Sequence, residues 1–192
     1  TIGGTPRSEI EIMGESTATL VVGPSLNKAA GILKTRTSVP DYHFEGLMGL
    51  DDCDAFTQAL AEISGKPVPE KIERHRAQLQ DAMVDSHFMI GFARVALAAD
   101  PDLLGMQVRF LTGMGAEVVS AVSPHKHESL NSLPIEKIII GDLEDMEKQA
   151  RAADAQLLIA NSHAAETASR LGIPLMRAGF PQYDHVGDYA RT

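Results

Sequence analysis

From Arg94 onward, short apolar runs alternate with helix-like segments, and this alternation constrains the fold more than any other feature of the chain. Strands are predicted at 94–99, 117–122, 136–141, 156–160 and 174–179, and helices at 101–114, 142–153 and 162–171. Runs such as "QLLIA" (156–160) are almost continuously apolar, which is typical of strands buried on both faces. The sequence therefore predicts an α/β fold, in which helices cover a parallel sheet.

The amino-terminal part shows the same elements in a shorter series. Helices are predicted at 6–14, 25–36 and 51–64, and strands at 18–22 and 41–46. A long helix at 69–91 follows, with Ile72, Leu79, Met83 and Ile90 on one face.

The domain organisation follows from this order of elements. We interpret residues 1–67 as the carboxy-terminal part of a preceding α/β domain, 68–91 as a connecting long helix, and 92–192 as a carboxy-terminal α/β domain. Since the chain begins at Thr1 without a methionine, we expect it to be a fragment of a longer, multidomain protein.

Charge and cysteine content exclude several classes of function. The chain carries 17 Lys and Arg against 26 Asp and Glu, a net charge of −9, which argues against nucleic acid and membrane partners. Its one cysteine, Cys53, excludes an internal disulfide framework and a self-contained cysteine-ligated zinc or iron–sulfur site. No apolar run approaches the roughly 20 residues of a membrane-spanning helix. We expect a cytoplasmic protein.

The candidate chemistry lies in the loops that follow the predicted strands, because ligands bind at the carboxyl ends of strands in open α/β sheets. Four such loops are "ADPD" (99–102), "SPHKHES" (123–129), "GDLED" (141–145) and "ANSHAA" (160–165). The glycine-rich motifs GxGxxG and GxxxxGK[ST] are both absent, which disfavours a nucleotide cofactor.

Asn161, Ser162 and His163 allow two interpretations. Asn or Ser before a helix accepts a backbone N–H as a cap, and His163 then occupies the first turn. Alternatively, the three side chains contact a ligand or a partner subunit. Asp100 and Asp142 also follow strands and precede helices, where capping accounts for them.

Other polar residues give weaker signals. His125 and His127 flank Lys126 in a polar loop, where two histidines would need further ligands to bind a metal. Cys53 lies near a helix start, where a thiolate is favoured, yet no base is placed beside it, and a packed thiol is the simpler interpretation. The residues alone show no catalytic constellation.

Several ordered motifs resemble the nitrogenase component 1 family. They are "QLQDAMVDSHFMIGFARVALAADPDLLGMQVRFLTGMGAEVV" (78–119) and "NSHAAETASRLGIPLMRAGFPQYD" (161–184), continued by similar segments at 3–23 and 63–79. The resemblance covers nearly the whole chain and implies Rossmann-like parallel sheets flanked by helices, as in nitrogenase component 1, within a multidomain chain.

Within the family, "IGDLEDMEKQARAADAQLLIANSHAAE" (140–166) is most similar to the β-like subunit of the cofactor-assembly scaffold. A catalytic β subunit has a longer insertion and an "NSYGK"-like turn, whereas this chain has a short "HESLNSLP" loop and His163. Ala160 departs from the glycine that is more frequent in the family.

The resemblance implies a non-catalytic fragment of a scaffold on which the precursor of the nitrogenase iron–molybdenum cofactor is matured. Its partners would be an α-like E subunit, a second copy of the β-like subunit and the nitrogenase iron protein. The full assembly would carry a 4Fe-4S cluster and the cofactor precursor, and this fragment would hold neither. Two alternatives remain: the β subunit of a nitrogenase-like reductase, and an autonomous small-molecule-binding domain. Three upstream cysteines would indicate the reductase, and one would indicate the scaffold.

Asp81 and Asp85 are the one candidate metal site. Four residues advance about 400° along a helix, so the two carboxylates are about 40° apart on one face. Arg74 is positioned to offset their repulsion, and a solvated polar face explains the pattern without a metal. The resemblance implies instead a divalent cation held between two β-like subunits, which requires ligands from a second chain.

Overall fold

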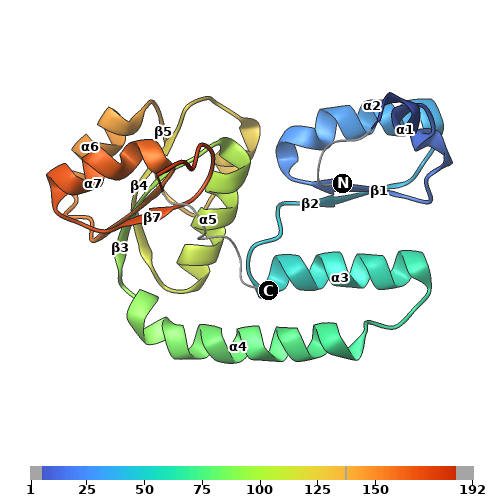
Figure 1. The fold of residues 1–192 in the computed structure, drawn as a ribbon, viewed down its shortest axis with the longest axis horizontal. Coiled ribbons are helices and arrows are strands. Elements are labelled where there is room, and N and C mark those ends of the chain that lie inside the picture. The colour runs from blue at the N-terminus through green and yellow to red at the C-terminus, as the bar shows by residue number, and fades with distance from the viewer. Residues whose placement is uncertain (1–5, 137, 185–192) are drawn as a thin grey trace. The chain divides into compact units, whose positions relative to one another are not determined.

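The computed structural model describes residues 6–136 and 138–184 (Figure 1). The chain divides into two compact units, Thr1–Leu79 and Gln80–Thr192, and each unit is described by itself below. The division falls within the long helix α4 (Glu70–Ile90), which contributes residues to both units.

The first unit is built around two short parallel strands, β1 (Thr19–Val22) and β2 (Asp41–Phe44). Its helices are α1 (Arg7–Glu11), α2 (Asn27–Thr37) and α3 (Leu50–Ser64), with 3-10 turns at Met13–Glu15 and Pro24–Leu26. The rings of Phe44 and Phe56 meet edge to face at 5.2 Å and join α3 to β2. The two strands and three helices are those that the sequence predicts.

Helix α4 exposes most of its surface. None of its residues is buried, although the sequence places four apolar residues on one face. Ile72 and Leu79 are 41% and 42% exposed, and Met83 and Ile90 are half-buried. The apolar face is therefore only partly covered by the described residues.

The second unit contains the alternating strands and helices that the sequence predicts from Arg94 onward. Its strands are β3 (Arg94–Ala98), β4 (Glu117–Ser123), β5 (Ile139–Ile140), β6 (Leu157–Ala160) and β7 (Leu175–Arg177). Its helices after α4 are α5 (Pro101–Gly113), α6 (Leu143–Ala152) and α7 (Ala165–Leu171), with 3-10 turns at Glu128–Ser132 and Ser162–Ala164. The five strands form one parallel sheet in the order β5-β4-β3-β6-β7.

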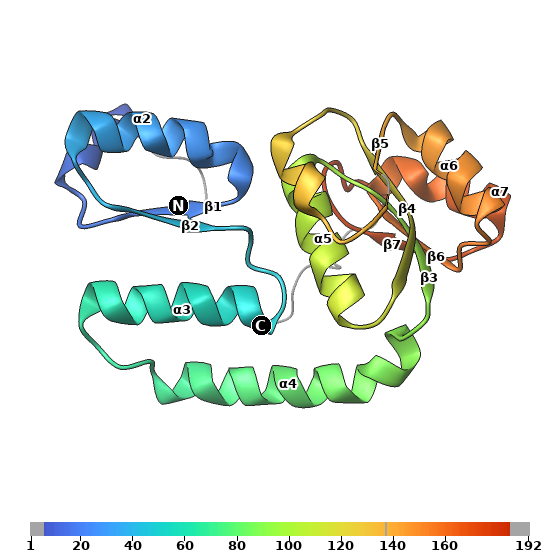
Figure 2. The ribbon, with the colours of Figure 1, turned by 180° about the vertical axis from the view of Figure 1, so that it is seen from behind.

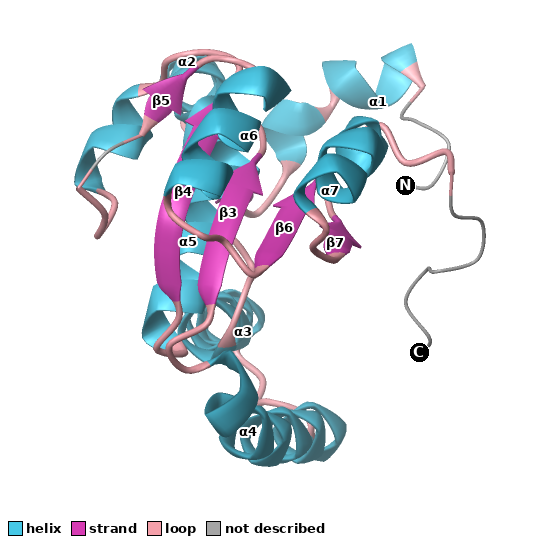
Figure 3. Ribbon diagram, turned by 90° about the vertical axis from the view of Figure 1, so that its left-hand side faces the viewer, coloured by secondary structure: helices cyan, strands magenta, loops and turns pink. Residues whose placement is uncertain are grey.

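Helices cover both faces of this sheet. Figure 3 shows α6 and α7 in front of the sheet and α5 behind it, and Figure 2 shows the same arrangement from another side. On the α5 face, Leu97, Leu104 and Val108 form the centre of a buried cluster. On the other face, Leu158 and Met146 form a second cluster with small alanines. The near-continuous apolar strands predict this double coverage, and the structure confirms it.

Several predicted elements differ in the structure. Of the predicted strand 136–141, Ile139–Ile140 form β5, which pairs with Val122 and Ser123 at the end of β4. The predicted strand 174–179 is shortened to Leu175–Arg177. The predicted loop 123–134 contains the 3-10 turn Glu128–Ser132, because Leu130 and Leu133 are buried in the cluster beneath α5 and anchor the loop.

Candidate functional site at the carboxyl edge of the sheet

The carboxyl ends of the strands in the second unit converge on one crevice. The chain leaves β3 towards β4 and later returns to pair β6 with the opposite side of β3, so the connections diverge between β3 and β6. Ligand sites in open α/β sheets form at such a point. The crevice has a volume of about 320 Å³ and is lined by Ala98, Ala99, Asp100, Val122, Pro124, Gly141, Asp142, Leu143, Asn161, Ala178, Gly179 and Phe180. All four loops that the sequence singles out contribute to it.

Asp100 and Asp142 cap the helices that begin at the crevice, as predicted. Asp100 Oδ1 accepts a hydrogen bond from the N–H of Leu103 at 3.2 Å, at the start of α5. Asp142 Oδ1 accepts from the N–H groups of Glu144 and Asp145, and its own N–H donates to Asp145 Oδ2, which completes a capping box. A side chain at Gly141 would meet the Asp145 carboxylate and displace it from the capping box.

Asn161 caps the turn that precedes α7 and also holds a distant segment. Its Oδ1 accepts from the N–H of His163 at 3.1 Å, and its Nδ2 donates to the carbonyl of Phe180 at 3.2 Å. The cap is the contact that the sequence predicts. The bond to Phe180 is a second role.

Ser162 and His163 do not act as caps; they contact residues of the same distant segment. Ser162 is 2% exposed, and its Oγ accepts from the N–H of Tyr183 at 3.1 Å. Its own N–H donates to the carbonyl of Pro181 at 3.0 Å. The exposed His163 has its Nδ1 3.2 Å from the hydroxyl of Tyr183. The three residues of the turn thus fix residues 178–184, called the closing segment below.

An ion pair also holds the end of the closing segment. Arg177 Nε lies 2.9 Å from Oδ1 and 2.8 Å from Oδ2 of Asp184. The hydrogen bonds from Arg177, and then from the Ser162 side chain, hold the pKa of the Asp184 carboxyl well below its usual range. Sequence reasoning missed these contacts because their partners lie 7 and 22 residues apart along the chain and no local pattern links them.

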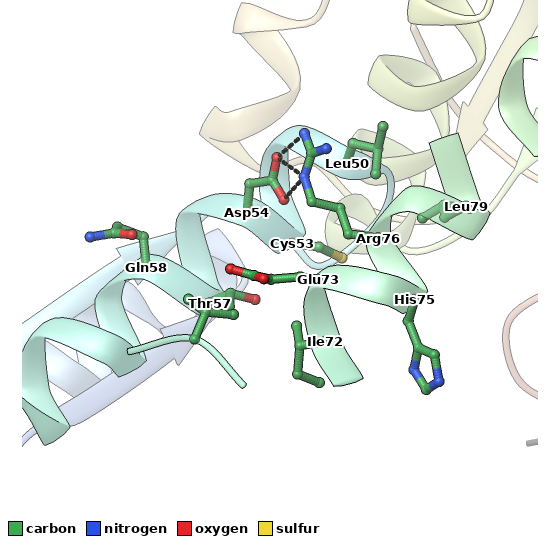
Figure 4. A pocket seen from close by; sticks show the side chains of 11 residues that line it. Leu50, Cys53, Asp54, Thr57, Gln58, Ile72, Glu73, His75, Arg76 and Leu79 are labelled. Carbon is green, nitrogen blue, oxygen red and sulfur yellow. Dashed lines mark hydrogen bonds and ion pairs between the residues drawn. The ribbon is translucent and has the colours of Figure 1, made fainter. Parts of the chain in front are cut away.

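A second pocket, of about 370 Å³, lies within the first unit between α3 and the first half of α4 (Figure 4). Arg76 reaches across it to Asp54, with Nε 2.8 Å from Oδ1 and Nη2 2.7 Å from Oδ2. Cys53 also lines this pocket, and its thiol donates to the carbonyl of Leu47 at 3.6 Å. Burial, together with the charges of Asp52 and Asp54, raises the pKa of the Cys53 thiol, so the helix start does not produce a thiolate here.

The remaining candidates stay apart from both pockets. Asp81 and Asp85 are exposed on α4, and Arg74, expected to offset them, lies instead 3.6 Å from Glu70. His127 Nδ1 accepts from the N–H of Ser129 and caps a 3-10 turn.

Within residues 6–136 and 138–184, no three or more His, Cys, Asp or Glu side chains are grouped closely enough to hold a metal ion. In the same ranges, no helix is both long and apolar enough to cross a membrane.

Comparison with known proteins defines the class. The model of the family described as nitrogenase component 1 type oxidoreductase matches residues 1–192, and the chain belongs to this family. A solved structure described as "Nitrogenase Cp1 at pH 6.5" superposes with a TM-score of 0.86 at 27% identity, over 98% of this chain and 45% of the other. The fold predicted from the sequence, Rossmann-like sheets of nitrogenase component 1 type, is thereby confirmed.

Curated proteins with similar sequences carry a more specific name than that of the family. The protein named "Nitrogenase iron-molybdenum cofactor biosynthesis protein NifN" from Klebsiella pneumoniae is 44% identical over 100% of this chain and 42% of its own length. Proteins of the same name from Nostoc sp. and Bradyrhizobium diazoefficiens are 45% and 43% identical, over 98% and 97% of this chain. The chain spans about 40% of the length of these relatives.

Proposed function

We propose that this chain is part of the β-like subunit of a scaffold on which the precursor of the nitrogenase iron–molybdenum cofactor is matured. In this role it acts in assembly and not in catalysis. The observation that carries the proposal is the 44% identity, over the whole chain, to a relative named for cofactor biosynthesis. In this proposal the "NSH" turn is structural, since its side chains contact the turn itself and the closing segment.

The described residues do not fit an iron–sulfur cluster or its precursor. A 4Fe-4S cluster is held by several cysteine thiolates, whereas Cys53 is the one cysteine of the chain. In our proposal the 4Fe-4S cluster and the cofactor precursor are therefore held elsewhere in the assembly. The proposed partners are the α-like E subunit, a second β-like subunit and the nitrogenase iron protein. Residues 1–67 would complete a preceding domain, and 68–91 would connect it to 92–192.

A chimaera tests this function. The segment of the Klebsiella pneumoniae relative that matches this chain is replaced by residues 1–192, and the product is co-expressed with the α-like partner of that relative. We expect a complex that contains iron and activates cofactor-free nitrogenase in vitro. The control graft places the same residues in the β subunit of a nitrogenase component 1 and should not support substrate reduction. The proposal would be contradicted if the scaffold chimaera assembled but delivered no cofactor while the control graft in the β subunit supported substrate reduction.

We also propose that Asp81 and Asp85 contribute to a cation site shared between two β-like subunits. Two observations support this site. Both carboxylates are exposed on α4, and Arg74 pairs with Glu70, so it does not offset the repulsion between Asp81 and Asp85. Carboxylate oxygens suit calcium, and a second chain must supply further ligands.

Calcium titration of the full assembly, read by subunit dissociation, tests the cation site. We expect Asp81→Asn/Asp85→Asn to abolish the calcium dependence, and Glu73→Gln, another exposed carboxylate of α4, to preserve it. Dissociation that ignores both calcium and the double substitution would make these residues ordinary surface charge.

A further inference from the structure

The crevice at the carboxyl edge combines an apolar lining with two exposed carboxylates. Ala98, Val122 and Ala178 are buried or half-buried, whereas Asp100 and Asp142 are exposed. Its volume of about 320 Å³ falls within the range of sites that enclose a small ligand or a single side chain. Such a site suits a group that is apolar along its length and polar at its end.

The charges around the crevice favour a cation. Asp100 and Asp142 each stand at the amino terminus of a helix, where a full negative charge exceeds the half positive charge of the helix end. The described residues that line the crevice include no Lys, Arg or His. Both charged side chains of the lining are therefore negative, which disfavours phosphates and carboxylates and attracts a cationic group.

An aromatic residue whose backbone is held by hydrogen bonds lines the same crevice. Phe180 lines the crevice and is 92% exposed. Its backbone is fixed by the Asn161 amide, and the next residue, Pro181, by the N–H of Ser162. A partner that covers Phe180 therefore does not have to order the backbone at this residue. The face of a phenyl ring attracts a cation, and a guanidinium group stacks on it best.

We propose that this crevice binds an arginine side chain presented by a partner protein. The apolar stem of arginine would lie along Leu143 and the alanines, and its guanidinium would meet the carboxylates and stack on Phe180. Lysine fits less well, because its ammonium group is a strongly hydrated point charge that does not stack. This proposal concerns recognition by the second unit and does not depend on the proposed scaffold function.

Titration of the 192-residue chain, followed by NMR, tests the chemistry of the site. The probe is N-acetyl-arginine amide, and the control is N-acetyl-citrulline amide, which has the same shape without the charge. We expect saturable shifts at crevice residues with the arginine probe and none with citrulline. Methylguanidinium should bind more weakly, because it lacks the stem. Equal binding of citrulline, or of methylguanidinium, would overturn the proposal, the latter in favour of a free small cation. An absence of binding by the arginine probe would overturn it as well.

Three variants localise the effect. In Asp100→Asn/Asp142→Asn the helix caps are preserved, since Asn caps as well as Asp, while both charges are lost. We expect binding of the arginine probe to weaken about tenfold, as the loss of two partly exposed ion pairs implies. Phe180→Leu retains the charges and an apolar surface at an exposed position, and should also weaken binding.

The matched control is Glu144→Gln, in the first turn of α6 but outside the crevice lining, and it should bind as the parent does. Unchanged affinity in both the aspartate double variant and Phe180→Leu, or an equal loss in Glu144→Gln, would refute the site.

Discussion

The two units of the chain are stabilised in different ways. In the second unit, four large side chains, Leu97, Leu104, Met146 and Leu158, are fully buried on the two faces of a five-stranded sheet. In the described part of the first unit, the buried apolar side chains are Val21, Ala30, Val39 and Ala59, and its two strands form only one pair. The comparison shows that similar α/β sequence patterns bury large apolar side chains completely only where the sheet has enough strands to form an extended core.

The first unit also carries a group of polar contacts around Asp41. Asp41 accepts hydrogen bonds from Lys34 and from His43 Nε2, and His43 Nδ1 lies 2.8 Å from Asn27 Oδ1. The Asp41 side chain is 8% exposed, but those of Lys34 and His43 are 57% and 43% exposed. Ion pairs with such solvated partners contribute little to stability compared with a buried leucine. We therefore expect core substitutions in the second unit to have the largest effects on the chain.

The largest expected effect is that of Leu97→Ala. Its side chain is 0% exposed between β4 and β6, and truncation of such a leucine costs about 2–5 kcal/mol through lost burial and the remaining cavity. The matched control in the first unit, Leu26→Ala, removes a side chain that is 50% exposed and should cost well under half as much. Urea denaturation measures both. Similar losses in the two variants would refute the contrast between the units.

The sequence predicts the second unit well because its signals are local. Runs such as "QLLIA" and the polar residues before each helix specify strands and caps within a few residues, and Asp100, Asp142 and Asn161 cap as predicted. The exposure of α4 is not predicted, because the periodicity of Ile72 and Leu79 indicates an apolar face but not what covers it.

The candidate site is predicted only in part. The four loops that follow the strands were expected to carry the chemistry, and all four line the crevice. The roles of Ser162 and of the closing segment were not predicted, because Ser162 and Tyr183 meet only when β6 and β7 pair in the folded sheet. A residue type at a loop position indicates that a polar contact exists, but its distant partner depends on tertiary structure.

Ser162→Ala should have the next largest effect. The Oγ of this 2% exposed residue accepts from the N–H of Tyr183, and the loss of one such hydrogen bond costs about 0.5–1.5 kcal/mol. We expect lower stability and faster hydrogen exchange at the Tyr183 amide, measured by NMR.

The control is His163→Ala, which removes an exposed side chain and should cost less. The His163 side chain contacts Tyr183 through its Nδ1 and through an edge-to-face ring contact at 5.4 Å. A larger loss in His163→Ala than in Ser162→Ala would show that the closing segment is held by the ring contact and not by the buried serine.

The pKa of the Asp41 carboxyl tests the polar contacts of the first unit. Hydrogen bonds from Lys34, and then from His43, lower the pKa of Asp41 from 3.8 to about 2. A carboxyl whose pKa is depressed on folding stabilises the fold fully above the unfolded value, and this contribution is lost as the pH falls through about 2. NMR titration of the Asp41 carboxyl should show this midpoint. Lys34→Met should raise the pKa more than His43→Gln, and the reverse order would contradict the assignment of causes.

The smallest expected effects compare the two halves of α4, one in each unit. In the second unit, Asp81 and Asp85 are like charges four residues apart, so Asp85→Asn should stabilise the helix by a few tenths of a kcal/mol. In the first unit, Glu70 stands in the first turn of α4, 3.6 Å from Arg74, so Glu70→Gln should destabilise it by a similar amount. Hydrogen exchange of the α4 amides in the isolated chain, at low ionic strength, shows whether each substitution stabilises or destabilises the helix. Added salt should shrink both changes, because these charges are exposed. Stabilisation by Glu70→Gln, or destabilisation by Asp85→Asn, would contradict this explanation. Other contacts within the chain, and not the charge interactions between residues four apart, would then determine the stability of α4.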